Sequence, residues 1–278
     1  MEIRRSEVPG IQITSIKGQD LPLEAKKNVA GVAALALLEA HNSKLGFEIF
    51  IEKNIKPGSG IGSSAASAAG AVAGINYLLG TPYTNEALVP FAMEGERLAC
   101  GSAHADNVAP ALMGGFTLVR NTNPLDVCAL PTPLELAATV IHPKIEVKTS
   151  DARAVLKQRV SLEKAIQQWA NVGALVSSLY EEDYDLLSRS LVDEIVEPSR
   201  AILIPHFAQL KSACKAAGAL GSGISGSGPS VFALSKGMTA ANEVAEAMKE
   251  VYTKTEIPFE IHVSPVKQTG VSFLEDLA

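Results

Sequence analysis

A glycine- and serine-rich stretch that runs directly into an alanine-rich helix pattern constrains the fold of this chain more than any other feature. The stretch reads Pro57-Gly58-Ser59-Gly60-Ile61-Gly62-Ser63-Ser64-Ala65-Ala66-Ser67, and residues 68–79 are rich in helix formers. The free N–H groups of a first helical turn and the positive end of the helix dipole bind anions. Glycine, which has no Cβ, lets the backbone close around a phosphate. The stretch therefore predicts a loop that binds nucleotide phosphates, with a flexible turn before a packed helix as the alternative.

Two common nucleotide-binding motifs are excluded. No lysine follows Gly62, so the P-loop pattern of Gly, four residues, Gly-Lys-Ser/Thr is not met. A second stretch, Gly221-Ser222-Gly223-Ile224-Ser225-Gly226, satisfies Gly-x-Gly-x-x-Gly, but a strand pattern at 230–234 follows it where a dinucleotide fold requires a helix. We interpret this second stretch as a close backbone approach, either to the phosphates or to the first loop, with a tight connection as the alternative.

Composition and charge describe a globular chain without a nucleic-acid surface. Of 278 residues, 47% are hydrophobic and 19% are charged, and the formal net charge is −6. No apolar run reaches about 18 residues, the length needed to span a bilayer. We therefore expect a soluble, cytoplasmic protein. Cys100, Cys128 and Cys214 are widely spaced and predict neither a disulfide framework nor a zinc site.

Apolar periodicity predicts an α+β chain of two domains. Segments 2–5 and 11–16 flank the turn dipeptide Pro9-Gly10 and are typical of a hairpin. The periodicity predicts helices at 23–40, 85–100, 161–180, 183–195, 204–217 and 240–252, with a capped helix start at 149–153, and strands at 47–51, 116–120, 136–141, 230–234 and 260–263. Asn28 falls on the first helix as a solvated or capping residue. The proline-containing segment 121–133 marks the expected boundary between domains 1–130 and 131–278.

Glu96 and Ser64 are candidate ligands of a magnesium ion. A carboxylate and a hydroxyl are hard oxygen ligands, and Mg²⁺ beside nucleotide phosphates keeps several waters. The alternative for Glu96 is a solvated charge on its helix, which also bears Glu94 and Arg97.

Five further polar residues are candidates for binding a substrate. His104, Asp106 and Asn107 lie within four residues between a helix and the Gly114-Gly115 turn, where they could orient a small polar molecule, or serve turn chemistry instead. Arg153 and Arg200 suit bidentate capture of a carboxylate, although any exposed arginine has the same appearance in a sequence.

These motifs together resemble a known family. Residues 57–66 look like the second motif of the GHMP kinases, and Gly223-Ile224-Ser225-Gly226-Ser227-Gly228-Pro229 looks like the third. Within that superfamily, residues 101–110, Gly114-Gly115 and 197–200 are similar to homoserine kinases. The resemblance covers nearly the whole chain. It implies a ribosomal-S5-domain-2-like ATP-binding domain at 1–130 and a ferredoxin-like domain at 131–278.

The resemblance also implies a reaction: ATP-dependent phosphorylation of the L-homoserine side-chain hydroxyl to O-phospho-L-homoserine, in threonine biosynthesis. ATP would be held by Pro57, Gly58, Ser59, Gly60, Ile61, Gly62, Ser63, Ser64 and Gly226. Mg²⁺ would be held by Ser64 and Glu96. Asn107 would hydrogen-bond the reacting hydroxyl, with Thr149 near the γ-phosphate. Arg153 and Arg200 would bind the substrate carboxylate, and His104 and Asp106 would shape the pocket. No residue is assigned as a general base.

Two alternatives stay open: another GHMP kinase acting on mevalonate or a sugar, and a non-catalytic S5-like binding or scaffold protein. The family's first motif, Pro-x-x-x-Asn-x-Gly-x-Gly-Phe-Asp, has no match in this sequence. We therefore expect the chain to lack the N-terminal strand and the acidic partner of the substrate ammonium, and to be a poor kinase. The expected partners are ATP and L-homoserine, with no nucleic acid and no membrane, and a homodimer is left open.

Overall fold

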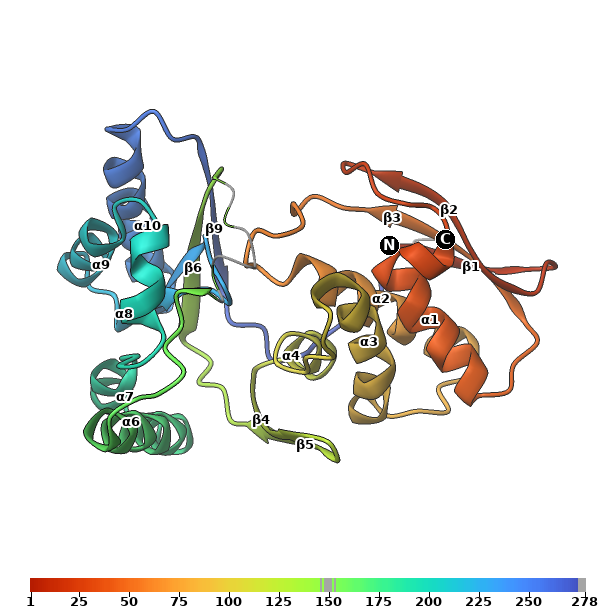
Figure 1. Ribbon diagram of the computed structural model, residues 1–278, viewed down its shortest axis with the longest axis horizontal. Coiled ribbons are helices and arrows are strands. Elements are labelled where there is room, and N and C mark those ends of the chain that lie inside the picture. The colour runs from red at the N-terminus through yellow and green to blue at the C-terminus, as the bar shows by residue number, and fades with distance from the viewer. Residues whose placement is uncertain (146, 148–151, 153, 275–278) are drawn as a thin grey trace. The chain divides into compact units, whose positions relative to one another are not determined.

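The computed structural model describes residues 1–145, 147, 152 and 154–274. Its backbone forms two compact units, each with its own hydrophobic core (Figure 1). Unit 1 comprises residues 1–57, 62–129 and the segment that begins at Lys267, and unit 2 comprises residues 58–61 and 130–266. The expected division at 130/131 differs from these units in three places, because residues 58–61 and Leu130 belong to unit 2 and the segment from Lys267 belongs to unit 1.

Unit 1 combines a helical layer with a three-stranded sheet and a hairpin. Its elements are β1 (Glu2–Ser6), β2 (Gly10–Lys17), η1 (Ala25–Lys27), α1 (Val29–Ala40), β3 (Gly46–Glu52), α2 (Ser63–Leu78), α3 (Asn85–Cys100), α4 (Val108–Met113), β4 (Phe116–Thr122) and β5 (Leu125–Leu130). Helices α1, α2 and α3 pack against one another. Their contact faces are rich in alanine, and Ala33, Ala68 and Ala92 are all fully buried. The strand and the helix predicted on either side of the glycine loop are confirmed as β3 and α2.

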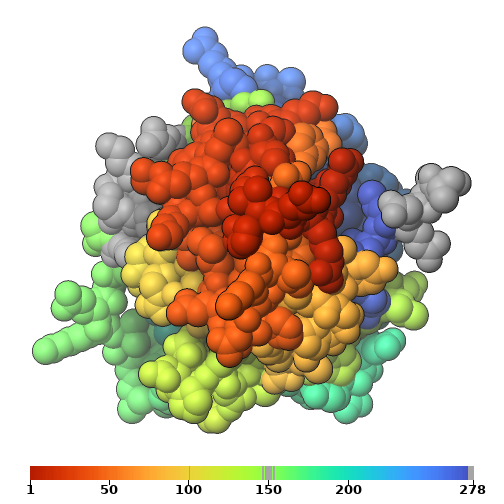
Figure 2. Space-filling model, turned by 90° about the vertical axis from the view of Figure 1, so that its right-hand side faces the viewer, coloured from red at the N-terminus to blue at the C-terminus, as the bar shows by residue number. Residues whose placement is uncertain are grey.

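The hairpin expected at the N-terminus is wrong. The sheet order is β1-β3-β2, so both outer strands pair with β3 and not with each other. Ile3 of β1 lies opposite Ile49 in an antiparallel pair, and Ile13 of β2 lies opposite the same residue in a parallel pair. The Pro9-Gly10 turn does reverse the chain, but a third strand lies between the two arms. That strand takes the central place because its apolar residues, such as Phe47 and Ile49, are fully buried. Figure 2 shows the red N-terminal residues lying across one face of unit 1, among orange segments that follow them.

The first helix begins six residues later than its apolar pattern. Residues 25–27 form the short 3-10 helix η1, and α1 starts at Val29. Asn28 is 5% exposed, and its Oδ1 accepts the backbone N–H of Ala30 at 3.0 Å. Asn28 is therefore the N-cap of α1, the second of its two expected roles.

The segment expected to mark the domain boundary contains regular structure. Strands β4 and β5 form a two-stranded sheet over residues 116–130, and the division between the units falls at its end. The sequence did not predict strand β5, because this strand is half-buried over most of its length and shows no clear alternation of apolar and polar residues.

Unit 2 is a four-stranded antiparallel sheet with helices packed on it. Its elements are β6 (Leu136–Pro143), α6 (Leu162–Glu181), α7 (Tyr184–Ser190), α8 (Glu197–Arg200), η2 (Ala201–Leu203), α9 (Phe207–Ala216), β7 (Gly221–Ile224), β8 (Val231–Lys236), α10 (Gly237–Thr253) and β9 (Phe259–Pro265). The strand order is β7-β8-β6-β9. Helix α10 packs on β6, β8 and β9, and α9 packs on α10. In this core, burial raises the pKa of the Cys214 thiol to about 11 and that of Tyr252 to about 12.

Two expectations for unit 2 are corrected. The helix expected at 183–195 ends at Ser190, as α7. Residues 221–224 form strand β7 where we expected a loop. Glycine is unfavourable in strand interiors, so the sequence carries no strand signal here. The glycine is nevertheless required, because a methyl group on Gly221 would lie 2.6 Å from Cβ of Leu191. The helix start expected at 149–153 lies, apart from Ala152, outside the described residues.

None of the helices within the described ranges is long and apolar enough to cross a membrane.

Candidate active site

The predicted phosphate loop has a backbone that only glycine adopts easily. Gly58, Gly60 and Gly62 have φ of 76°, 82° and 70°, in the left-handed region. Gly62 is the N-cap of α2, which begins at Ser63. The N–H of Ala66 bonds to the Gly62 carbonyl at 2.9 Å, and helix geometry leaves the N–H groups before it without an intrahelical acceptor. This end of α2 therefore has the properties of an anion site.

The second glycine-rich stretch contacts the first loop, which was one of its two expected roles. Within unit 2, the Ser225 hydroxyl donates to the Gly60 carbonyl at 2.8 Å, and the Ser230 hydroxyl donates to the Ser59 carbonyl at 2.6 Å. A methyl group on Gly60 would lie 2.7 Å from the Ser225 carbonyl oxygen and 2.8 Å from that of Gly228. The two backbones approach so closely that Gly60 has no room for a side chain.

A buried lysine holds the first turn of α2 in unit 1. Lys53 follows β3 and is 7% exposed, and its ammonium donates to the Ser63 carbonyl at 2.7 Å and to the Ser67 hydroxyl at 2.6 Å. Burial lowers the pKa of Lys53, while the nearby negative charge of Glu96 opposes that shift. The sequence analysis missed Lys53. A lysine after a strand is usually solvated, so no pattern marks this one.

Glu96 lies in α3 next to Lys53. Its burial excludes the alternative expected for it, a solvated charge on the helix surface. Its side chain is 4% exposed. Gly95 allows the close packing, because a methyl group there would lie 2.5 Å from the Val29 carbonyl oxygen and 3.0 Å from Cβ of Ala68. Glu96 is thus a neighbour of the ammonium that holds Ser63, one residue before the half-buried Ser64.

The donors Ser64 and Glu96 suit a hard divalent cation in their chemistry. A carboxylate and a hydroxyl oxygen fit Mg²⁺, which completes its octahedron with water and phosphate oxygens. Among the residues that the structure describes, no group of three or more His, Cys, Asp or Glu side chains could hold a metal ion. A cation bound by these two donors would therefore depend on the nucleotide for further ligands.

Of the polar trio before α4, Asn107 is placed at the loop. Had Gly62 a Cβ, that atom would lie 3.6 Å from Oδ1 of Asn107, so the amide lies beside the start of α2. His104, Asp106 and Asn107 are all exposed, whereas Ala105 between them is buried and anchors the turn.

Arg200 lies in unit 2 at the end of α8. Its Nε donates to the Ala152 carbonyl at 3.2 Å, and one terminal nitrogen donates to the Gly226 carbonyl at 3.2 Å. Arg200 and Gly226 line the same cavity of about 220 Å³. The other two residues expected near the substrate or the γ-phosphate, Arg153 and Thr149, lie outside the described residues.

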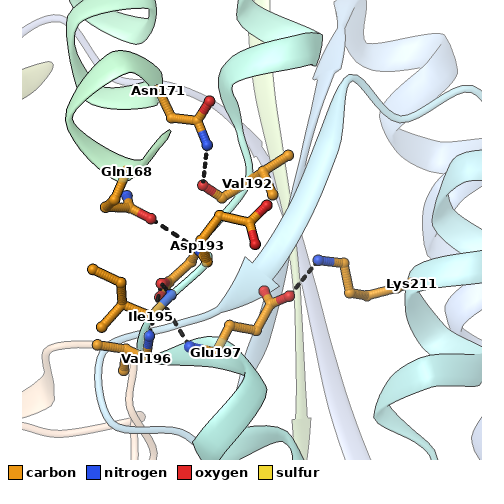
Figure 3. A network of polar contacts seen from close by, with 9 residues as sticks. Gln168, Asn171, Val192, Asp193, Ile195, Val196, Glu197 and Lys211 are labelled. Atoms are coloured by element: carbon orange, nitrogen blue, oxygen red, sulfur yellow. Dashed lines mark hydrogen bonds and ion pairs between the residues drawn. The ribbon is translucent and has the colours of Figure 1, made fainter. Parts of the chain in front are cut away.

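A capping network positions α8 and with it Arg200. The Asp193 carboxylate accepts the backbone N–H groups of Ile195 at 2.9 Å, Val196 at 2.8 Å and Glu197 at 3.0 Å (Figure 3). The Glu197 carboxylate pairs with Lys211 of α9. Because Asp193 satisfies N–H groups that the short helix leaves free, the segment after α7 is held in a fixed, non-helical path.

Comparison with known proteins identifies the class to which this loop and these units belong. The family model for the GHMP kinases N terminal domain matches residues 28–115, and that for GHMP kinases C terminal matches residues 175–254. The chain belongs to the GHMP kinases, and the α+β two-domain architecture expected from the sequence is confirmed.

The similar proteins narrow this class. A homoserine kinase of Chlorobium phaeobacteroides is 47% identical over 98% of this chain and 88% of its own length. The crystal structure of homoserine kinase from Cytophaga hutchinsonii has a TM-score of 0.92 and 50% identity, over 96% of this chain and 86% of that one. The L. major mevalonate kinase in complex with R-mevalonate, at a TM-score of 0.67 and 20% identity over 95% of this chain and 85% of that one, shares the fold. Among the GHMP kinases, the chain belongs to the homoserine kinases.

Proposed function

We propose that this chain transfers the γ-phosphoryl group of ATP to the side-chain hydroxyl of L-homoserine, giving O-phospho-L-homoserine and ADP. The observation that carries the proposal is the start of α2, where three left-handed glycines precede a helix N-terminus with Asn107 beside it. Phosphoryl transfer depends mostly on positioning and on stabilising charge, which this arrangement supplies.

The loop would bind the ATP phosphates through backbone groups. After Pro57, residues 58–64 provide N–H groups and the helix dipole, and the contacts of Ser225 and Ser230 fix the loop before ATP arrives. Gly226 would take part from the second loop. A loop held in its binding conformation loses less entropy when the nucleotide binds, which strengthens binding.

Ser64 and Glu96 would hold Mg²⁺, which, when bound, neutralises charge on the phosphates. Lys53 would be a positioning residue. Its two hydrogen bonds fix the first turn of α2, and its positive charge lies near the buried Glu96.

Homoserine would be bound at its two ends by different groups. The Asn107 amide would hydrogen-bond the reacting hydroxyl, and Thr149 would lie near the γ-phosphate. The Arg200 guanidinium would bind the carboxylate together with Arg153, and His104 and Asp106 would shape the pocket. We assign no general base. The transition state of phosphoryl transfer is loose, so the hydroxyl needs orientation more than early deprotonation.

The direct test is turnover by the purified protein with ATP, Mg²⁺ and L-homoserine, with the phosphorylated product identified by mass spectrometry. Mevalonate and galactose are the comparison substrates. We expect homoserine to be the preferred substrate, because the kinase relatives at 47–50% identity are homoserine kinases. Faster turnover of mevalonate or galactose would contradict the substrate assignment.

The melting temperature measured with and without ATP distinguishes an ATP-binding kinase from a scaffold protein without catalysis. A nucleotide that binds only the folded state raises the melting temperature, by an amount equivalent to about 2.7 kcal/mol at a hundredfold excess over Kd. No shift with ATP and no turnover would favour the scaffold, whereas a shift without turnover would locate the failure at the homoserine end.

A further inference from the structure

His142 is a buried histidine near the end of strand β6, and it reaches the predicted phosphate loop through another side chain. The residue is 5% exposed, and its Nδ1 lies 3.1 Å from the Ser230 hydroxyl. The same hydroxyl lies 2.6 Å from the Ser59 carbonyl. Within unit 2, these three residues therefore form a continuous chain of hydrogen bonds from the sheet to the loop.

The alternation of strand β6 directs His142 to the loop. Ile141 belongs to the core of unit 2, where β6 packs against α10. Successive side chains of a strand point to opposite faces, so His142 lies on the face away from that helix. Thr139 lies on the same face as Ile141, and its hydroxyl donates to the Ala241 carbonyl at 2.8 Å. The strand thus has a buried polar side chain on each face, and that of His142 is joined to the loop.

The directions of these hydrogen bonds follow from the number of hydrogens. A serine hydroxyl carries one hydrogen, and a carbonyl oxygen carries none. Two oxygens 2.6 Å apart need a hydrogen between them, so the Ser230 hydroxyl donates to Ser59. That hydroxyl has no second hydrogen to give, so it accepts the bond from His142. Nδ1 of His142 therefore carries a hydrogen.

The Ser230 hydroxyl is shielded from solvent. Ser230 is fully buried and Ser59 is 2% exposed. The Ser230 carbonyl accepts the backbone N–H of Ser225 at 2.8 Å, which fixes the backbone just before β8. Water cannot replace a partner at this position, so a bond lost at His142 leaves the buried hydroxyl with one partner fewer.

The chain of hydrogen bonds fixes the orientation of one peptide in the loop. The peptide that joins Ser59 to Gly60 is trans, so its carbonyl and its N–H point in opposite directions. Because Ser230 holds the Ser59 carbonyl, the Gly60 N–H points away from Ser230. Within the described part of the chain this N–H has no hydrogen-bond acceptor. Backbone N–H groups that are left free in this way are typical of anion sites.

We infer that His142 is a positioning residue for ATP. Through Ser230, it holds the Ser59 peptide in the orientation that offers the Gly60 N–H to a phosphate oxygen. Hydrogen bonds in series strengthen one another, so the bond that His142 donates makes the Ser230 hydroxyl a better donor to Ser59. The inference rests on the proposed function, because this N–H meets a phosphate only if the loop binds ATP.

Two substitutions of equal shape test the donor at His142. In His142→Asn the amide nitrogen is as many bonds from the backbone as Nδ1 and can still donate to Ser230, whereas His142→Leu has the same shape and no donor. In calorimetric titrations of the whole protein with ATP and Mg²⁺, we expect His142→Asn to stay within about twofold of the parental Kd. His142→Leu should raise that Kd about 3- to 10-fold. Equal Kd values for the two variants would overturn the inference.

Thr139→Val is the matched control for a merely structural effect. It removes a buried hydrogen bond from the other face of the same strand, so it should lower the melting temperature and leave the Kd for ATP unchanged. The KM for homoserine should stay near the parental value in His142→Leu and in Thr139→Val. If Thr139→Val raises the Kd for ATP as much as His142→Leu does, His142 serves general stability and the inference is wrong.

A double-mutant cycle tests whether His142 acts through Ser230. Ser230→Ala should raise the Kd for ATP at least as much as His142→Leu, because it removes the bond to Ser59 itself. The variant with both substitutions should then match Ser230→Ala within about twofold. Full additivity of the two effects would mean that His142 acts by another route, which would contradict the inference.

Binding and turnover separate this inference from the proposed function. The expected order of Kd values without phosphorylation of homoserine would overturn the proposed function and support the role of His142. Turnover of homoserine together with equal Kd values for His142→Asn and His142→Leu would do the reverse. A parental protein that does not bind ATP would overturn both.

Discussion

At the scale of single residues, burial decides which charges belong to the site. Glu94 and Glu96 are two residues apart on α3, yet the Glu94 side chain is 42% exposed and paired with Arg97, whereas Glu96 is 4% exposed beside Lys53. The same contrast separates Lys53 from Lys17, whose side chain is 73% exposed. The two residues of each pair are of the same type. The exposed Glu94 and Lys17 therefore serve as controls for substitutions at the buried Glu96 and Lys53.

Glu96→Gln should remove magnesium-dependent turnover while leaving the fold intact. The amide keeps the shape of the carboxylate but loses the anionic ligand, so we expect kcat to fall by about 100-fold or more, since a bound metal ion contributes several kcal/mol. Glu94→Gln is the control and should turn over at nearly the parental rate. Equal rates for the two variants across a magnesium titration would remove Glu96 from the metal site.

Arg200→Ala should weaken homoserine binding and spare ATP. Loss of one charge-assisted partner costs about 1.5–3 kcal/mol, which corresponds to a rise of roughly 10- to 150-fold in KM for homoserine. Arg189→Ala, on the exposed side of α7, serves as the control. If the homoserine KM is unchanged while the protein is folded, Arg200 does not bind the carboxylate.

Lys53→Met should destabilise the protein strongly, and removing Glu96 as well should restore part of the loss. The single variant leaves a buried carboxylate without its ammonium neighbour, at a cost of about 3–5 kcal/mol. In Lys53→Met with Glu96→Gln that charge is gone, so unfolding in urea should show a positive coupling between the two sites. Lys17→Met should change the free energy of unfolding by less than about 1 kcal/mol. Additive effects of the two substitutions would mean that the two charges do not interact.

At the scale of elements, the second glycine-rich stretch holds the first loop within unit 2. Gly58 and Gly60 both have left-handed φ, but only Gly60 has the backbone of Ser225 and Gly228 against it. Alternate glycines thus have different tasks. At position 58 only the left-handed φ requires glycine. At position 60 both the left-handed φ and the lack of room for a side chain require it.

Gly60→Ala should therefore cost more than Gly58→Ala. Left-handed φ costs about 1–3 kcal/mol at either position, and the added methyl group at Gly60 brings an overpacking cost of about 1–3 kcal/mol. Thermal unfolding and ATP affinity measure both effects. Similar losses of stability in the two variants would show that the close approach of the second loop does not persist in solution.

At the scale of the whole molecule, the two units differ in what holds their cores. The core of unit 1 is dominated by alanine-rich helices, whereas the core of unit 2 contains Cys214 and Tyr252, which can ionise. The Tyr252 hydroxyl donates to the Pro205 carbonyl at 2.8 Å. Both groups stay protonated in the folded chain at pH values where an unfolded chain releases the proton.

The free energy of unfolding should consequently fall with alkaline pH. The folded pKa values of about 11 for Cys214 and about 12 for Tyr252 exceed the ordinary values of 9.0 and 10.0. Because these pKa values are raised, the stabilisation is complete below pH 9 and is lost as pH rises through the folded values. Urea unfolding between pH 8 and 11 measures the slope, and Cys214→Ala should make it shallower above pH 9. An unchanged slope in that variant would contradict the raised pKa of Cys214.

The sequence by itself determined the parts of this protein that depend on local backbone chemistry. Alternate glycines permit the left-handed backbone of the loop and the run of helix formers marks the start of α2, so the loop, this start and the strand before it were predictable, and they led to the kinase family. Asn107 and Glu96 were also candidates from the sequence, each with a structural alternative, and their roles in the reaction stay predictions.

Only the tertiary structure decided which strands pair and which charges are buried. β3 lies between β1 and β2 because its buried apolar residues favour the centre of the sheet. Strand order depends on how the apolar content of three strands compares, so the sequence of one strand alone does not predict it. Lys53 was missed for the same reason. Its burial follows from Ser63, Ser67 and Glu96, which are distant in the chain and become its neighbours only when the helices pack.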